Sequence, residues 1–272
     1  MAKPIIKWLG GKTQCLNYIR EKMPAEYNNY YEPFFGGGAV LFNLIEGPAT
    51  VSDINQELIN VYKQVKENPS KIILHTEVCD HTHNTASDPK EVYYKIREDF
   101  NNNLGSSTSA QAAKFIYLNK HCFNGLYRVN KKGQFNVPFN GKAFGSSYDR
   151  TNIREVSERL QNVNLLCCDF ADTVKDAAAG DLIYFDPPYA PLTPTSFTDY
   201  TKEGFSYEDH VRLANLFKDL ADRGVYCMLA NHNTELIREL YKDYNFTEID
   251  VRRSINRDSN NRKGKEVIIT NY

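Results

Sequence analysis

Short apolar runs alternate along most of the chain with segments whose apolar residues recur at helical spacing. The runs predict β-strands at 30–34, 49–53, 164–169, 181–186, 225–231, 246–254 and 266–272. The helical spacing predicts helices at 39–46, 54–66, 206–223 and 233–243. Such alternation is typical of an α/β fold with a largely parallel sheet and helices on both faces. We expect the last two strands to form a hairpin, and Asp53 to cap the helix that follows it.

The alternation stops between residues 75 and 160. Helices are predicted there at 89–100 and 109–121, and a loop-rich stretch follows them. We therefore expect residues 1–74 and 161–272 to form one domain that is interrupted by an inserted subdomain, 75–160.

Composition places the chain among ordinary globular proteins. Of its 272 residues, 41% are hydrophobic and 25% are charged. No apolar stretch approaches the ~20 residues of a membrane span, and the first residues do not resemble a signal peptide. The six cysteines form no CxxC pair, which favours reduced thiols in the cytoplasm.

Cys79, His81 and His83 are spaced closely enough to suggest a metal site. No fourth ligand accompanies them, and the surrounding sequence is polar. We interpret this stretch as a surface loop and expect no metal.

The net charge of −1 argues against a globally basic nucleic-acid-binding protein, but the charges are unevenly distributed. Residues 120–150 contain six Lys or Arg and one acidic residue, and residues 252–265 show the same ratio. Two basic patches on an acidic chain are consistent with binding to a polyanion. Charge alone fits two solvated loops equally well.

A glycine cluster, "YYEPFFGGGAVLF", follows the first predicted strand. Glycines allow a ligand to approach the backbone closely where a strand turns into a helix. The dinucleotide fingerprint G-x-G-x-x-G is not met, because Leu41 occupies its third glycine position. Asp53, at the end of the next strand, is placed to accept both hydroxyls of a ribose. The pattern therefore favours a nucleoside ligand, and the alternative is a simple tight turn.

Five motifs in order, "KWLGGK", "EPFFGGGAV", "FNGLYR", "FNVPF" and "DPPY", resemble the Dam-type DNA adenine-N6 methyltransferases. The resemblance extends over nearly the whole chain. It implies a Rossmann-like methyltransferase sheet, S-adenosyl-L-methionine (SAM) as cofactor, S-adenosyl-L-homocysteine as product and a GATC-type site. It also implies a cytoplasmic protein that acts as a monomer on double-stranded DNA, away from membranes.

The resemblance assigns residues to the cofactor and to DNA. Those implied to hold SAM are Trp8, Lys12, Glu32, Phe34, Phe35, Gly36, Gly38, Asp53, Asp169, Phe170 and Asp186. Those implied to contact DNA are Lys7, Phe123, Asn124, Leu126, Arg128, Asn136, Pro138 and Lys142. Many relatives carry Gly-Arg after the "NVPF" stretch, where this chain has Asn140-Gly141-Lys142, so a contact by Lys142 stays open.

The strand at 181–186 ends in Asp186, Pro187, Pro188 and Tyr189, which we predict to be catalytic. The amino group of adenine is a poor nucleophile, because its lone pair is delocalised into the ring. The Asp186 carboxylate and the Pro187 carbonyl can each accept one N6–H and aim the nitrogen at the methyl group. The prolines fix the direction of the carbonyls, and Tyr189 offers a stacking face for an extruded base. An isolated Asp-Pro-Pro would otherwise be only a turn.

The loop-rich stretch fits DNA recognition. Arginine is the usual bidentate reader of guanine in the major groove, which makes Arg128 the candidate reader. Leu126 is placed to touch a thymine methyl, and Asn124 to fill the space left by a flipped base or to bond to the orphaned partner of that base. Phe123 is either a wedge between bases or part of the core of the hairpin.

Two other classes of function fit part of the pattern. One is an RNA or protein-glutamine N-methyltransferase, and the other is a catalytically silent, sequence-specific DNA-binding protein. The sequence does not decide whether a restriction enzyme accompanies the protein in a restriction-modification pair.

Overall fold

The computed structural model describes residues 2–191, 205–252 and 263–272. These residues form two compact units, and the chain passes from one unit to the other several times. The first unit contains residues 1–11, 36–43 and 53–167, and the second contains 12–35, 44–52 and 168–272. Residue 75, where the sequence predicted that the insertion begins, lies inside helix α4.

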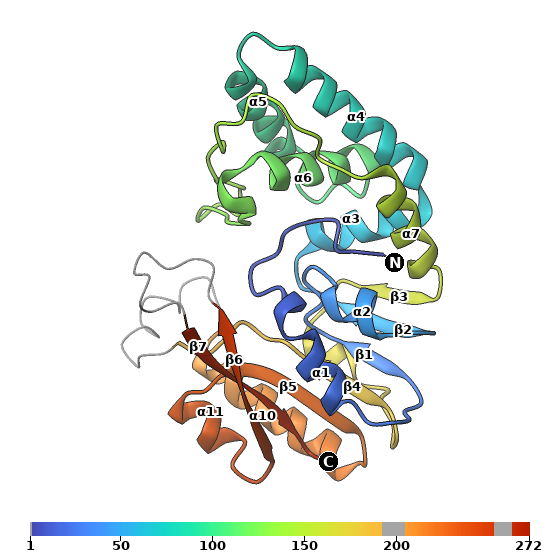
Figure 1. The fold of residues 1–272 in the computed structure, drawn as a ribbon, viewed down its shortest axis with the longest axis vertical. Helices are drawn as coiled ribbons and strands as arrows, with labels where there is room; N and C mark the ends of the chain where they lie inside the picture. The colour runs from blue at the N-terminus through green and yellow to red at the C-terminus, as the bar shows by residue number, and fades with distance from the viewer. Residues whose placement is uncertain (1, 192–204, 253–262) are drawn as a thin grey trace. The chain divides into compact units, whose positions relative to one another are not determined.

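The second unit is built on a mixed sheet. Its strands are β1 (Tyr30–Glu32), β2 (Ala49–Ser52), β4 (Leu182–Phe185), β5 (Tyr226–His232), β6 (Asn245–Arg252) and β7 (Lys263–Thr270). They lie in the order β2-β1-β4-β5-β7-β6. The pairs β1–β2, β1–β4 and β4–β5 are parallel, whereas β7 is antiparallel to both β5 and β6. The expected C-terminal hairpin is therefore confirmed (Figure 1).

Helices cover this sheet because its strands are apolar on both faces. They are α1 (Leu16–Lys22), α8 (Phe170–Thr173), α10 (Tyr207–Asp222) and α11 (Glu235–Leu240), with a short 3-10 turn η1 (Lys12–Gln14). Ile183 and Phe185 of β4 belong to one core cluster with Phe217 of α10. Tyr184 lies on the opposite face of β4 and is also buried, near Cys15 at the start of α1. The predicted α/β fold with two covered faces is confirmed.

The first unit is mainly helical. It contains most of α2 (Ala39–Leu44), followed by α3 (Gln56–Glu67), α4 (Pro69–Thr85), α5 (Pro89–Asn102), α6 (Ser109–His121), α7 (Arg150–Leu160) and the strand β3 (Val163–Leu166). Residues 123–139, here called the arm, leave α6 through the turn η2 (Phe123–Gly125) and form a loose hairpin. Its bridges join Val129 to Phe135 and Cys122 to Phe139.

Two local predictions in this unit were wrong. The stretch around Cys79, His81 and His83 is not a loop but the interior of α4, with His83 completely buried. His83 bonds to the Tyr117 hydroxyl and the Lys142 carbonyl, and Asp80 accepts from Ser147, so the polarity of these two residues did not indicate exposure. Asn55, not Asp53, caps α3, because its side chain accepts the backbone N–H of Leu58 at 3.1 Å.

The cysteines of the described residues form no disulfide. No helix in the described part of the chain is long and apolar enough to cross a membrane. No group of three or more His, Cys, Asp and Glu side chains in the described ranges is arranged to hold a metal ion.

Candidate active site

The parallel strands of the second unit bring Asp-Pro-Pro-Tyr to their shared carboxyl edge, where open α/β sheets bind ligands. The strand β4 is buried along its full length, and Asp186 is the first residue after it. The turn is anchored further on, because the backbone N–H of Ala190 donates to Asn231 Oδ1 at 2.9 Å. His232 Nδ1 donates to the carbonyl oxygen of Ala190 at 2.8 Å. The end of β5 thus holds the turn in place.

Asp186 forms a buried ion pair with Lys12. The Lys12 Nζ lies 2.7 Å from Asp186 Oδ1, and the two side chains are 6% and 18% exposed. Burial raises the pKa of Asp186 to about 6, and the opposing charge of Lys12 keeps it from rising further. At neutral pH the carboxyl group is therefore ionised and able to accept a hydrogen bond.

Tyr189 is fixed on three sides. Its hydroxyl donates to Glu266 Oε2 at 3.0 Å, and the edge of the His232 ring packs against it at 4.7 Å between centroids. The Lys12 ammonium lies 4.7 Å from the centre of the Tyr189 ring. Burial raises the pKa of the Tyr189 hydroxyl, which therefore stays protonated and keeps donating to Glu266.

An aromatic cluster lies in the same unit. Phe34 stacks on Phe170 at 5.4 Å between ring centroids, and the Phe205 ring meets Phe34 at 5.7 Å, nearly edge-on. The Arg212 guanidinium lies 4.1 Å from the centre of the Phe170 ring. Phe34 is partly exposed, whereas Phe170 is buried.

Asp169 has a role in the fold that the sequence did not predict. Its two carboxylate oxygens accept from Arg212 Nη1 at 2.9 Å and Nη2 at 2.8 Å. It also caps α8 through the backbone N–H of Ala171. Burial by itself would raise the pKa of Asp169, but the Arg212 and Ala171 donors outweigh it and hold the pKa below its usual value.

Glu32, at the end of β1, is 2% exposed. Its Oε2 accepts from the Tyr30 hydroxyl at 2.9 Å. Phe35, three residues further along, is buried as well, and its backbone N–H donates to the carbonyl of Ser52. The backbone that leads into the glycine cluster is therefore held by the neighbouring strand β2.

The first unit contains the glycine turn and Asp53. Gly36 and Gly38 have φ values of 50° and 71°, in the left-handed region. A Cβ on Gly36 would lie 2.7 Å from Cδ1 of Trp8, so only glycine fits at this position. Trp8 itself stacks on Tyr127 at 5.3 Å.

The Asp53 carboxylate is held by the backbone of the glycine turn and by the backbone at the start of α3. Oδ2 accepts from the Gly36 N–H at 3.1 Å, and Oδ1 from the Asn55 N–H at 2.9 Å. Burial raises the pKa of Asp53 despite these two donors. Each oxygen has a further lone pair, so the carboxylate fits a vicinal diol such as a ribose.

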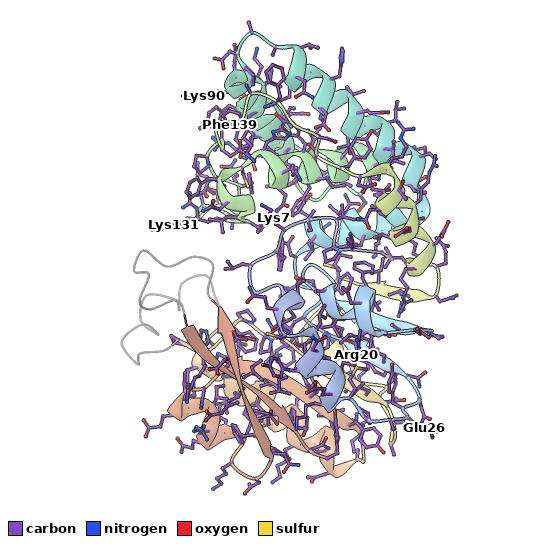
Figure 2. All side chains as sticks on the ribbon, in the orientation of Figure 1. Lys7, Arg20, Glu26, Lys90, Lys131 and Phe139 are labelled. Carbon is purple, nitrogen blue, oxygen red and sulfur yellow. The ribbon has the colours of Figure 1, made fainter. Side chains whose placement is uncertain are left out.

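The arm presents most of the predicted DNA-contacting side chains to solvent. Phe123 is 51% exposed, which rules out the alternative that it forms the core of the hairpin. Asn124 adopts a φ of 57°, and Arg128, Pro138 and Lys142 are exposed, whereas Leu126 and Asn136 are partly buried. Figure 2 shows Lys131 at the outer edge of the first unit.

Lys7 is exposed and lies against Gly125 in the turn η2, where the arm begins. Its backbone N–H donates to Asn119 Oδ1 at 2.8 Å, and Asn119 Nδ2 donates to the carbonyls of Lys7 at 2.9 Å and Gly125 at 3.2 Å. The buried amide of Asn119 thus ties the N-terminal segment to the arm. No sequence signal marked this residue.

Acidic side chains offset part of the positive charge of the two basic patches. Arg150, counted in the first patch, forms an exposed ion pair with Glu77. Residues 253–262 of the second patch lie outside the described residues, and Lys265 lies 3.3 Å from Glu248.

A mixed sheet with an antiparallel β7 and an ionised carboxylate in an Asp-Pro-Pro-Tyr turn fit a SAM-dependent methyltransferase that acts on an amino nitrogen. The chain belongs to the D12 class of N6 adenine-specific DNA methyltransferases, whose family model matches residues 8–255. The predicted activity, SAM-dependent methylation of adenine in DNA, is thereby confirmed over the RNA, protein and non-catalytic alternatives.

Similar proteins extend over nearly the same length. The chain is 44% identical over 276 residues to the type II methyltransferase M1.LlaDCHI of Lactococcus lactis subsp. cremoris, covering 99% of this chain and 95% of the relative. It is 41% identical over 286 residues to the type II methyltransferase M.MjaIII of Methanocaldococcus jannaschii, covering 99% of each. It is 32% identical over 271 residues to the DNA adenine methylase of Escherichia coli K12, covering 99% and 95%.

Proposed function

We propose that this methyltransferase binds GATC in duplex DNA as a monomer, turns the adenine out of the helix and methylates its N6 at Asp-Pro-Pro-Tyr. The observation that carries the proposal is the ionised, mostly buried Asp186 at the end of β4. A base that is stacked in a duplex cannot reach a carboxylate that is only 18% exposed, so the adenine has to leave the stack.

The residues of the second unit would orient the amino group. The Lys12 ion pair engages Oδ1 of Asp186, and Oδ2 accepts one N6–H while the Pro187 carbonyl accepts the other. SAM supplies an electrophilic methyl group on a positively charged sulfur. Tyr189 offers its ring to the base, and the bond to Glu266 keeps that ring from turning away.

The cofactor would be held by residues whose chemistry fits its parts. In the first unit, Trp8, the glycine turn and Asp53 suit the methionine and ribose groups. In the second unit, Phe34, Asp169 and Phe170 suit the adenine, with Glu32 and Phe35 shaping the backbone that precedes the glycines. The arm and Lys142 would contact DNA, so that residues 75–160 form the recognition part of the protein and the remainder the catalytic part.

The proposal is tested by expressing the protein in cells that lack adenine methylation and sequencing the modified adenines. We expect N6-methyladenine in GATC and in no other tetranucleotide. Methylation of a different sequence would overturn the GATC assignment, and methylation of single strands in preference to duplex would overturn base extrusion from the helix.

Asp186 predicts a pH dependence of the methyl-transfer step. Its pKa is raised to about 6, and protonation removes the charge that pairs with Lys12 and makes Oδ2 a weaker acceptor of the N6–H. The single-turnover rate should therefore be flat above pH 6 and fall about tenfold per pH unit below it. Rates measured by rapid quench between about pH 5 and 8 check this prediction.

Two variants sharpen the pH experiment. Asp186→Asn carries no titratable group and should lose the inflection. Lys12→Met removes the charge that holds the pKa of Asp186 down, so its inflection should move to higher pH. A wild-type rate that is unchanged through pH 6 would show that Asp186 does not contact the reacting nitrogen.

The exposed lysines of the arm predict the salt dependence of DNA binding. Lys131 and Lys132 lie in the turn of the arm, and no carboxylate is paired with them among the described residues. The logarithm of the binding constant should fall with log[salt] by ~0.9 for each phosphate contacted. Replacing both lysines by Ala should reduce this slope by about 1 to 2 and weaken all sequences alike. An unchanged slope, measured by fluorescence anisotropy, would place the footprint elsewhere.

A further inference from the structure

Arg128 does not extend freely from the arm. Its Nε donates to Asn136 Oδ1 at 2.7 Å, and its Nη2 donates to the backbone carbonyl of Asn136 at 3.3 Å. The backbone N–H of Asn136 donates in turn to the carbonyl of Arg128 at 3.1 Å. One residue on the opposite side of the hairpin therefore holds both the main chain and the side chain of the arginine.

The backbone on either side of Asn136 is fixed by α5. Asn101 accepts the N–H of Phe135 at 2.8 Å and donates to its carbonyl at 3.0 Å, as a neighbouring strand would. The Tyr93 hydroxyl donates to the carbonyl of Val137 at 2.8 Å, and both Phe135 and Val137 are buried. Asn136 thus lies between two anchored residues, and both its side chain and its backbone carbonyl accept from the Arg128 guanidinium.

The two hydrogen bonds decide which edge of the guanidinium remains available. Arginine has five N–H donors in a rigid planar fork. The Nε–Nη2 edge faces Asn136, so the donors left for a ligand are on the end-on edge formed by Nη1 and the outer hydrogen of Nη2. That edge can bind the O6 and N7 acceptors of guanine bidentately.

We propose that Asn136 is a positioning residue for sequence discrimination, which presents the end-on edge of Arg128 to a guanine instead of contacting DNA itself. The inference rests on the proposed role of Arg128 as guanine reader. An exposed arginine without a partner would have to be ordered on binding, and Asn136 removes that cost before DNA arrives. Because a wrong base gains nothing from the orientation, the benefit is confined to one base pair.

The test is a double-mutant cycle. The measured quantity is the discrimination ratio, which is kcat/KM for GATC divided by kcat/KM for a duplex in which the G·C pair of that guanine is replaced by A·T. Asn136→Ala should lower the ratio about 2- to 12-fold, the cost of ordering one long side chain. Arg128→Ala should lower it further. The double variant should match Arg128→Ala alone, because Asn136 acts through Arg128.

Two further readouts separate positioning from other roles. Asn136→Asp keeps an acceptor for Arg128 Nε and loses the amide donors, so its ratio should stay within about twofold of wild type. Substrate with 7-deazaguanine, which lacks the N7 acceptor, should slow the wild type several-fold more than it slows Asn136→Ala. Asn130→Ala, in the turn of the same arm, is the matched control and should leave the ratio unchanged.

Other outcomes would overturn the inference. Additive losses in the double variant would mean that Asn136 contacts DNA independently of Arg128. A lower melting temperature with an unchanged ratio would mean that Asn136 only stabilises the hairpin. If Arg128→Ala itself keeps full discrimination while GATC is still methylated, the role of Arg128 fails and the positioning of Asn136 fails with it, although the proposed methylation stands.

Discussion

Asp186→Ala should reduce methyl transfer to duplex GATC by at least about 100- to 1,000-fold, the usual loss when one oriented partner of a transition state is removed. The carboxylate is the only charged group of the Asp-Pro-Pro-Tyr turn, and it is ionised at neutral pH because its pKa is about 6. SAM should still bind, since the proposed ribose and methionine contacts are made by other residues. Calorimetry with SAM beside single-turnover kinetics measures both effects.

Asp181, at the other end of the same strand, provides a matched control. It is also buried, and it accepts hydrogen bonds from the backbone and side chain of Asn29 and from the backbone of Ala178. Asp181→Ala should lower the free energy of unfolding by about 1–3 kcal/mol but leave turnover per folded molecule near wild type. Asp186→Asn should lie between wild type and Asp186→Ala, because the amide oxygen still accepts one N6–H. Near-normal turnover of Asp186→Ala would remove the catalytic assignment.

The strands were predicted well because their burial is continuous and leaves a clear pattern. β4 is buried at every position, which in sequence is a run of apolar residues between two aspartates. α4 was missed for the opposite reason. Its outer face carries exposed Leu74 and Val78 while its inner face buries Asp80 and His83, so no apolar stripe marks the buried side.

The partners of the site residues could not be predicted from sequence. Lys12 and Asp186 lie 174 positions apart, and neither residue carries a local signal for the other. The same holds for Arg212, which pairs with Asp169, and for Glu266, which fixes Tyr189. Motifs identify the residues that a reaction needs, whereas the contacts that set their charge and direction depend on which strands become neighbours.

Arg128→Ala should lose about 1–3 kcal/mol of discrimination at one base pair of the site, roughly a 5- to 150-fold change in preference. The arginine is exposed, and its side-chain bonds to Asn136 lie on the surface of the arm, so the loss of folding stability should be small. The physical reason for a single affected position is that a bidentate contact involves one guanine. Methylation rates on GATC and on every single-base variant, for wild type and mutant, check the prediction.

The double variant Lys131→Ala/Lys132→Ala is the control for this experiment, since it removes two exposed charges from the turn of the same arm. A phosphate contact carries no sequence information, so that variant should slow all substrates by a similar factor and leave their ranking intact. Raising the salt concentration should reproduce its effect in the wild type, but should not reproduce the effect of Arg128→Ala. If Arg128→Ala also slows every sequence equally, then Arg128 binds a phosphate, and the discrimination of this methyltransferase has to come from other side chains of the arm.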